Sequence, residues 1–393
     1  MKTICTFIFS LAIALGMAQW PQYSIGTTLE LGGVHVFSNG DVLIAGEMGL
    51  MKRSSDCGST WTDVDITYLN DIGKFYFIDQ NTGYVLGDDA AFGKTTDGGL
   101  TWTFSNTPAS DDLEGLYFLN ADMGWMVGKE GNIIHTSDGG ATWMTQSSGS
   151  PARLHGVHFI DEMHGIVCGR DNTLLTTDNG GQTWTPLILA TSGDMKDIAF
   201  AQGSAYIAAE GGLYRLNSTW DNVEFIAIDP NSEFEDVYFH NESIGWACGG
   251  PGKVMATNNG GETWIDIGIE GSPFELSAIH GQSFNQAFTV GEFGQINGVC
   301  TAVGLEGADF SETPWSVHYA SDGTLHILFP DQGPRQPRFQ IMDITGAMIA
   351  EESLTPLSSQ NMYSIPAPDV AGVYLISMIE AGAIQTKRIV IHE

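Results

Sequence analysis

The sequence is short of basic residues. It has 15 lysines and arginines against 47 aspartates and glutamates, which gives a formal net charge of −32 over 393 residues. A surface this acidic repels phosphate backbones, so we expect no nucleic-acid partner. The acidity favours solubility after export, or an encounter with cations.

Long apolar runs are also missing after the first residues, so the sequence predicts no transmembrane segment. The beginning differs. Residues 1–18 read MKTICTFIFSLAIALGMA, in which one lysine precedes a short uncharged run and a small-x-small ending. This pattern is typical of a secretory signal peptide. We expect cleavage between Ala18 and Gln19 and export of the mature chain.

Glycine, in contrast, is abundant, and 49 glycines indicate tight turns between short strands. One phrase recurs, as TTDGGLTW at 95–102, TSDGGATW at 136–143 and TDNGGQTW at 177–184. The tryptophans that end its copies follow one another at intervals of 41, 41, 41 and 80 residues, and 80 is two periods. A period near 40 residues with four short strands per unit predicts a β-propeller. These tryptophans are Trp61, Trp102, Trp143, Trp184 and Trp264.

The strand pair that precedes the phrase occurs in seven copies, such as LYFLNADMGWMVG at 116–128. The last copy lacks the phrase and its final strand. Trp20 lies 41 residues before Trp61, so we expect the mature N-terminus to supply that strand and close the ring. The sequence therefore predicts an all-β fold, with a seven-bladed propeller at 19–308 and a small antiparallel β-sandwich at 309–393.

The phrase is expected to form the turn between the third and fourth strands of a blade. Its acidic residue can accept backbone N–H bonds, and its glycines allow positive φ. Asparagine replaces aspartate in two copies, which keeps an acceptor and discards the charge, so a repeated catalytic carboxylate is excluded. Besides the tryptophans, the structural residues of the phrase are Asp56, Asp97, Asp138, Asn179 and Asn259.

These residues match the Asp-box, S/T-x-D-x-G-x-T-W, of bacterial neuraminidase repeats, in which the box is a structural turn remote from the active site. The longer pattern, G-[WYI]-x-x-G followed by the box every 40–41 residues, resembles photosystem II stability/assembly factor-like propellers over roughly 19–305. That resemblance implies the fold. Family members are lumenal assembly factors with a basic patch. Residues 19–308 here carry 37 acids against 10 bases, so we transfer neither patch nor partner.

Beyond about residue 309 the period stops and a different pattern begins. The segments FQIMDITG at 339–346, AGVYL at 371–375 and KRIVI at 387–391 resemble the type A C-terminal sorting domain of the type IX secretion system of Bacteroidota. The resemblance implies passage across the outer membrane by the type IX machinery, removal of the tail and attachment to the outer cell surface. Its marker residues are Gly346, Gly372, Tyr374 and Lys387.

A candidate binding site follows from the strand order. With the first strand innermost, the turns between second and third strands share the face opposite the boxes with the connections between blades. We expect this partly acidic ring to bind a glycan, a protein or a cation, with no catalytic residue, metal site or cofactor. The turns place six charged residues there: Glu47, Asp88, Lys129, Arg170, Glu210 and Glu292.

Two enzyme classes are alternatives to a binding propeller. A sialidase needs three converging arginines. The propeller has four arginines in all, and two of them are expected on the box side, so the sequence argues against a sialidase. The alternative function is a surface glycoside hydrolase with paired carboxylates at the mouth of the propeller, because acids are plentiful there.

Cysteine is scarce, with five residues, one of them in the predicted signal peptide. Cys168 and Cys248 share a repeat position in blades four and six, too far apart for a disulfide. Cys57 and Cys300 lie in adjacent blades and form the one pair that the predicted fold could bring together.

Overall fold

The computed structural model describes residues 20–188, 193–220, 222–226, 233–269, 271–284 and 286–300, and the backbone of seven strands between 316 and 391. Residues 17–303 form one compact unit, and residues 304–393 fall in a second one. The predicted signal peptide (1–18) and Gly346 lie outside the described residues. Among the described residues, no helix has the length and apolar character needed to cross a membrane.

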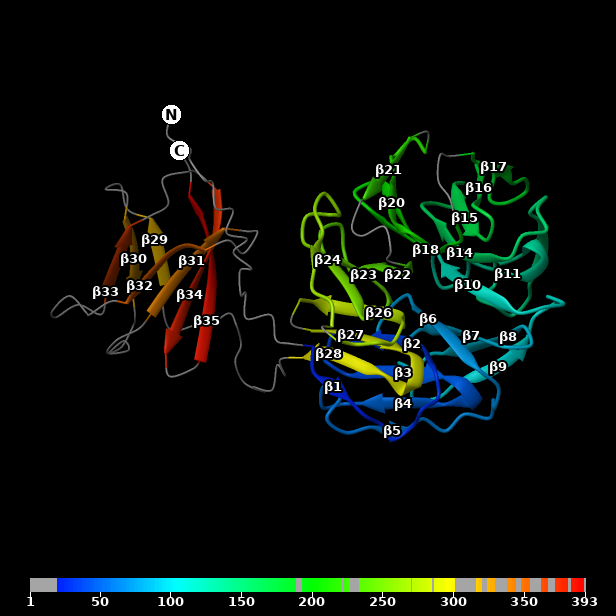
Figure 1. The fold of residues 1–393 in the computed structure, drawn as a ribbon, viewed down its shortest axis with the longest axis horizontal. Coiled ribbons are helices and arrows are strands. Elements are labelled where there is room, and N and C mark those ends of the chain that lie inside the picture. The colour runs from blue at the N-terminus through cyan, green and yellow to red at the C-terminus, as the bar shows by residue number, and fades with distance from the viewer. Residues whose placement is uncertain are drawn as a thin grey trace, which may run out of the picture. The chain divides into compact units, whose positions relative to one another are not determined.

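Seven antiparallel four-stranded sheets form the first unit and are arranged as a ring (Figure 1), so the predicted seven-bladed propeller is confirmed. Blade one consists of β2 (Leu31–Val36), β3 (Val42–Gly46), β4 (Met51–Ser54) and β5 (Thr62–Asp63). Blade two has β6 (Ile72–Phe77), β7 (Gly83–Gly87), β8 (Ala91–Thr95) and β9 (Thr103–Asn106). Blade three has β10 (Leu113–Phe118), β11 (Gly124–Gly128), β12 (Asn132–Thr136) and β13 (Met144–Ser147).

The remaining blades repeat this order. Blade four contains β14 (Leu154–Phe159), β15 (Gly165–Gly169), β16 (Thr173–Thr177) and β17 (Thr185–Pro186). Blade five contains β18 (Met195–Ala201), β19 (Ser204–Ala209), β20 (Gly212–Leu216) and β21 (Val223–Ile226). Blade six contains β22 (Glu233–Phe239), β23 (Gly245–Gly250), β24 (Lys253–Thr257) and β25 (Ile265–Asp266). Blade seven contains β26 (Leu276–Ser283), β27 (Gln286–Gly291), β28 (Ile296–Cys300) and the N-terminal strand β1 (Gln22–Tyr23).

Both ends of the propeller meet in blade seven. Strand β1 pairs antiparallel with β28, with Tyr23 opposite Ile296. Trp20 is 9% exposed and packs in the cluster that holds Trp246 and Val299. A disulfide between Cys57 and Cys300 links blade one to blade seven. Cys168 and Cys248 are free and buried.

The apolar core lies between neighbouring blades. Tyr84 of blade two stacks on Phe118 of blade three, with ring centroids 3.6 Å apart. Trp125 of blade three stacks on Phe159 of blade four at 3.5 Å. All four side chains are almost fully buried. Because each sheet buries its faces against the next, a blade depends on its neighbours for stability.

The Asp-box turns share one hydrogen-bond pattern. The Asp138 carboxylate accepts the Thr142 N–H (2.8 Å) and the Thr142 hydroxyl (2.6 Å). In the fourth blade, Asn179 Oδ1 accepts the Thr183 N–H (3.0 Å), and its Nδ2 donates to the Thr183 hydroxyl (2.8 Å). Aspartate and asparagine therefore bridge the same two groups, with the hydroxyl reversed from donor to acceptor. The turn needs a planar acceptor and no charge.

The second unit contains two antiparallel sheets. One is formed by β29 (Ser316–Tyr319), β30 (Thr324–Leu328) and β33 (Met362–Pro366). The other has the order β32 (Met348–Ser353), β31 (Arg338–Asp343), β34 (Gly372–Glu380) and β35 (Ala383–Ile391). Gly372 and Tyr374 lie in β34. Lys387 lies in β35, opposite Ile376 of β34. The packing of these sheets into a sandwich and their sorting role stay predictions.

Candidate functional site

The face opposite the boxes, called the mouth face below, carries the turns between the second and third strands of the blades. Three of these turns are short 3₁₀ segments: η1 (Glu47–Gly49), η2 (Lys129–Gly131) and η3 (Glu292–Gly294). At each of their tips a non-glycine residue has positive φ: Met48 (57°), Glu130 (56°) and Phe293 (54°). The turn geometry projects these three side chains outward, and the tips of blades one and seven are apolar.

Three of the six predicted mouth residues hold the backbone in place. The Glu47 carboxylate accepts the N–H of Glu30 (3.0 Å), which enters the inner strand of the same blade. Glu292 accepts the N–H of Glu275 (3.3 Å) in the same way. Glu210 accepts the N–H of Asp194 (3.2 Å). One oxygen of each carboxylate thus fixes the connection that leads into its own blade.

The other three predicted residues lie beside partners from the connections. Lys129 forms an ion pair with Asp112, and Arg170 lies 3.5 Å from Asp194. Burial raises the pKa of Asp88, and the nearby Asp112 raises it further. The sequence could not give these ion pairs, and the binding role of the six residues stays a prediction.

A cavity of about 490 Å³ occupies the centre of the mouth face. Of the six predicted residues, Asp88 and Arg170 line it; the other four lie outside its lining. Its walls come from the start of the inner strands of all seven blades, and they divide by charge. The basic side, in blades four and five, holds Arg153, His155 and Lys196, while Glu30 and Glu235 face it from blades one and six.

The basic side is largely neutralised by its own neighbours. Arg153 pairs with Glu114, and His155 Nε2 lies 3.4 Å from the other oxygen of that carboxylate. Lys196 reaches across to Glu235 at 3.1 Å. These contacts leave little free positive charge at the mouth.

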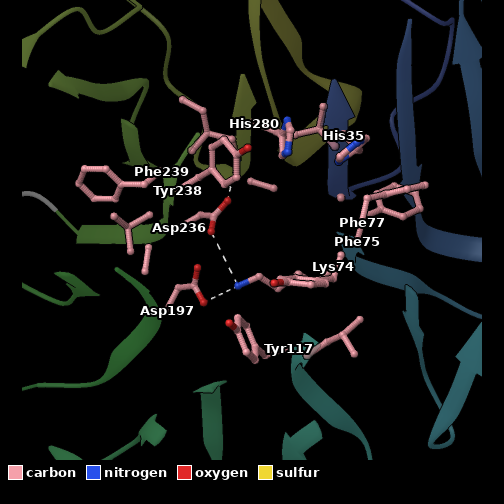
Figure 2. A pocket seen from close by; sticks show the side chains of 18 of the residues that line it. His35, Lys74, Phe75, Phe77, Tyr117, Asp197, Asp236, Tyr238, Phe239 and His280 are labelled. Carbon is pink, nitrogen blue, oxygen red and sulfur yellow. Dashed lines mark hydrogen bonds and ion pairs between the residues drawn. The ribbon is translucent and has the colours of Figure 1, made fainter. Parts of the chain in front are cut away.

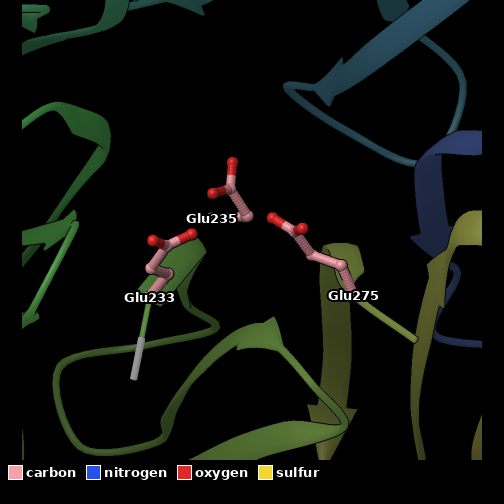
Figure 3. A group of neighbouring side chains, drawn as sticks. All are labelled: Glu233, Glu235 and Glu275. Carbon is pink, nitrogen blue, oxygen red and sulfur yellow. The ribbon is translucent and has the colours of Figure 1, made fainter. Parts of the chain in front are cut away.

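The acidic side extends beyond the cavity. Glu233, Glu235 and Glu275 bring carboxylate oxygens within 4.8 Å of one another (Figure 3). Burial raises the pKa of Glu275, and the neighbouring Glu235 raises it further. Three carboxylates at this spacing suit a hard cation or a positively charged side chain. Lys196 already compensates one of them.

The centre of the propeller also holds a polar cluster that the sequence analysis missed. Lys74 Nζ forms an ion pair with Asp197 and lies 3.8 Å from Asp236 Oδ1 (Figure 2). The three residues come from blades two, five and six. Lys74 is enclosed by the inner strands, yet 31% of its side chain stays accessible because it faces the central cavities. Lys74 and Asp236 line both the mouth cavity and a second cavity behind it.

This second cavity, of about 580 Å³, leads toward the box face and is called the box-side cavity. Aromatic and imidazole rings line it in close pairs, some stacked and some tilted. His280 lies between His35 (4.2 Å) and Tyr238 (4.1 Å), measured between ring centroids. On the other side, His158 lies between Tyr117 (4.2 Å) and Phe200 (4.5 Å).

The histidines of this cavity are neutral at ordinary pH. Burial lowers the pKa of His158 and of His280 to about 3, and burial also places the pKa of His35 well below its usual value. Burial raises the pKa of Asp236 far above the usual carboxyl range, although Lys74 acts against this; Asp197 then raises it further. Of the charged residues that line this cavity, Lys74, Asp197 and Asp236 lie on the inner strands, and the exposed Asp79 lies in the turn between β6 and β7.

The repeat alignment contained a signal for this cluster. Each inner strand has a buried apolar residue at its first or second position, and two residues after it four blades have small residues, which are Gly33, Gly115, Gly156 and Ala278. The other three have Lys74, Asp197 and Asp236. Each inner strand has a bulge near this position, as at Leu154/Gly156, and the bulge turns the residue at this position toward the axis of the propeller. Where most repeats have a small residue, a charged residue at the equivalent position marks a place where the fold leaves room for a larger side chain.

Comparison with protein families finds a partial match. A family model described as Photosynthesis system II assembly factor YCF48 matches residues 59–151. No curated protein sequence matches the chain.

Solved structures share the propeller fold. The structure of YCF48 bound to D1 peptide is 19% identical, with a TM-score of 0.59, covering 72% of this chain and 95% of that chain. YCF48 from Cyanidioschyzon merolae is 21% identical, with a TM-score of 0.57, covering 72% of this chain and 99% of that chain. The extracellular domain of a one component system from B. thetaiotaomicron is 11% identical, with a TM-score of 0.57, covering 95% of this chain and 58% of that chain. At these identities the likeness concerns the fold alone.

Proposed function

We propose that the chain is a non-enzymatic binding propeller whose mouth face captures a basic, partly apolar protein segment. The observation that carries this proposal is that blades one, six and seven together present both exposed apolar side chains and carboxylates on the mouth face. Met48, Leu69 and Phe293 are 70, 77 and 59% exposed. Glu233 and Glu275 have no ion pair among the described residues.

Charge argues for a basic partner. Most of the lysines and arginines at the mouth already have acidic partners, whereas the carboxylates of blades six and seven outnumber their cations. A positive segment gains from this potential and is steered toward it. Apolar side chains beside the charges supply contact area that a free cation does not use. The YCF48 structure bound to D1 peptide shows that a propeller of this fold can hold a peptide.

The location of the protein is part of the proposal. Residues 1–18 and the tail segments support export through the Sec and type IX routes and display on the outer cell surface. The similarity in fold to an extracellular domain agrees with this location. Its test is cell fractionation of the full chain and of a chain lacking residues 309–393. We expect the first in the outer-membrane fraction and the second in the periplasm. Retention of both in the cytoplasm contradicts the proposal.

The binding proposal is tested with a peptide array on the full mature chain. The array varies net charge and apolar content independently, in 50 mM and 300 mM salt. We expect basic peptides with apolar residues to bind, more weakly at high salt. The variant Phe293→Ser should lose about tenfold in affinity. Leu100→Ser is the matched control, because Leu100 is equally exposed at 59% but lies on the box face.

Other outcomes contradict the proposal in recognisable ways. Equal binding of acidic and basic peptides would show that charge does not select the partner. An equal loss of affinity in Phe293→Ser and Leu100→Ser would show that the peptide does not bind at the mouth face. Binding of glycans in place of peptides, with release of shorter sugars, favours the glycoside hydrolase alternative.

A further inference from the structure

The box-side cavity is a second candidate site, which adjoins the mouth cavity at Lys74 and Asp236 and leads toward the box face. We propose that it binds a small primary ammonium compound with an apolar body, whose ammonium group docks on Asp236 and whose body lies against the aromatic wall. The argument rests on the hydrogen bonds of Asp236, the charge of the cluster and the lining of the cavity, and it does not depend on the function proposed for the mouth face.

Asp236 has an oxygen with room for a donor. The residue is 7% exposed. Its Oδ2 accepts the Ile279 N–H at 2.8 Å. Its Oδ1 has the Lys74 ammonium at 3.8 Å, which is beyond hydrogen-bond distance, because Lys74 is drawn to Asp197 instead. The Asp236 carboxyl also shares a side-chain hydrogen bond with Asp197, which requires a proton between the two groups. Once that proton leaves, Asp236 is a buried carboxylate that favours another donor. Figure 2 shows Asp236 facing the open centre of the cavity.

The cluster also lacks one positive charge. Two carboxylates face one ammonium, and the histidines of the cavity are neutral. The groups that face Asp236 are Lys74 on β6, Asp197 on β18, Tyr238 on its own strand, Cys248 on β23 and the Ile279 N–H on β26. Burial keeps the tyrosine and the cysteine uncharged. The missing charge is therefore supplied by a proton or by a bound cation.

The wall of the cavity selects the kind of cation. A volume of about 580 Å³ is far larger than one inorganic ion needs and lies in the range of small-molecule sites. Phe37, Phe77, Phe200 and Phe239 line it with carbon. Tyr238 and His280 stack, Tyr117 and His158 lie tilted against each other, and His280 Nδ1 already accepts the Val36 N–H, so the wall offers mainly carbon to a ligand. An ammonium head with an apolar body matches a charged floor and an apolar wall.

Three probes of similar shape test the proposal: benzylammonium, benzyl alcohol and benzoate. Titration calorimetry on the full mature chain at pH 8 should show benzylammonium binding at least about tenfold more tightly than benzyl alcohol, with no binding of benzoate. Affinity for benzylammonium should rise about tenfold or more from pH 6 to pH 8, because the cation competes with the proton held by Asp236. Heats in two buffers of different ionisation enthalpy should show proton release on binding.

The variant Asp236→Asn keeps the acceptor for Ile279 and removes the charge. It should lose benzylammonium binding and its pH dependence. Asp266→Asn is the matched control, since it lies in the same blade on an outer strand and pairs with Lys253. If the Asp236→Asn variant fails to fold, the comparison of the three probes and the proton release, both measured on the wild-type protein, still test the proposal.

Four results overturn the proposal. Tighter binding of benzoate assigns the cavity to anions through Lys74. Equal binding of the alcohol makes it a purely apolar cavity. Displacement of benzylammonium by millimolar K⁺ makes it an inorganic cation site. Absence of binding by all three probes removes the site.

Discussion

Lys74 of blade two reaches across the centre of the ring to Asp236 of blade six, with Nζ 3.8 Å from Oδ1. Its stronger contact is with Asp197 of blade five. The apolar clusters of this propeller join adjacent blades, as in the stacking of Tyr84 on Phe118. The lysine therefore connects blades that have no shared sheet face, and it does so at the point where the two central cavities meet.

Replacing Lys74 by methionine should lower the free energy of unfolding by about 3 kcal/mol at pH 7, because two buried carboxylates lose their cation. This is the low end for a buried pair, since the side chain faces the channel. The loss should grow with pH: without the lysine, the folded state favours protonated carboxyls, so stability falls as pH rises through their raised pKa values. Urea unfolding at pH 5 and pH 8 measures both effects.

Lys253→Met is the control for that experiment. Lys253 pairs with Asp266 at 2.6 Å on the outer strands, and Asp266 is half exposed. Its loss should cost less than about 1 kcal/mol and change little with pH. Equal effects of the two variants would show that the central cluster contributes no more than a surface ion pair.

The propeller was predictable from the sequence because its signals are local and repeated. The box turn needs only an acceptor, two glycines and a tryptophan, and Asp138 and Asn179 both bond the N–H and the hydroxyl of the threonine four residues on. Trp20 was found by its spacing alone, and the structure pairs the strand beside it with β28. The sequence left open whether Cys57 and Cys300 pair; ring closure places blade one beside blade seven, and the structure joins the two cysteines.

The central cluster was not predicted because it depends on three residues about 40 and 120 positions apart. In the sequence, Lys74, Asp197 and Asp236 are single members of three separate strands, and nothing local links them. Only the bulge in each inner strand and the closure of the ring bring them together. At the mouth, the positions of Glu47 and Glu292 were predictable, but their bonds to backbone N–H groups required the turn geometry.

Asp138 provides a test of the charge in the box. The Thr142 hydroxyl, followed by the Thr142 N–H, holds the pKa of Asp138 at about 2, below its ordinary value. A lowered pKa in the folded state stabilises the protein above the unfolded pKa, and this stabilisation is lost as pH falls toward 2. The Tm difference between wild type and Asp138→Asn should therefore shrink from pH 6 to pH 2.

The same substitution separates hydrogen bonding from charge. At pH 7, Asp138→Asn should lower the Tm by about 2 °C and Asp138→Ala by about twice as much, because only alanine leaves the Thr142 groups without a partner. Differential scanning calorimetry gives the order. An asparagine variant as unstable as the alanine variant would mean that the carboxylate charge, and not the acceptor, supports the turn.

The disulfide joins Cys57 and Cys300, which are 243 residues apart in the sequence, and so closes a long loop of the chain. Restricting so long a loop in the unfolded chain stabilises the folded state by about 4 kcal/mol. The double variant Cys57→Ser/Cys300→Ser should therefore unfold at lower urea concentration. Reductant should lower the midpoint of the wild type and leave that of the double variant unchanged. A response of the double variant to reductant would point to the buried Cys168 or Cys248.

Trp20 tests how the ring is closed. The side chain is buried in the cluster of blades six and seven with Trp246, Ile279 and Val299, while its backbone leads into β1, the outermost strand of blade seven. Trp20→Ala removes a large buried side chain, so it should cost about 3 kcal/mol or more. It should also free β1 and expose the edge of β28, which favours association between molecules. Urea unfolding and light scattering on the mature chain measure the two effects together. If the variant keeps wild-type stability and stays monomeric, then the disulfide and the contacts between blades close the ring without the N-terminal strand. If the variant loses stability and associates, then pairing of β1 with β28 is needed to close the ring, because the disulfide alone leaves the hydrogen-bonding groups of β28 unpaired.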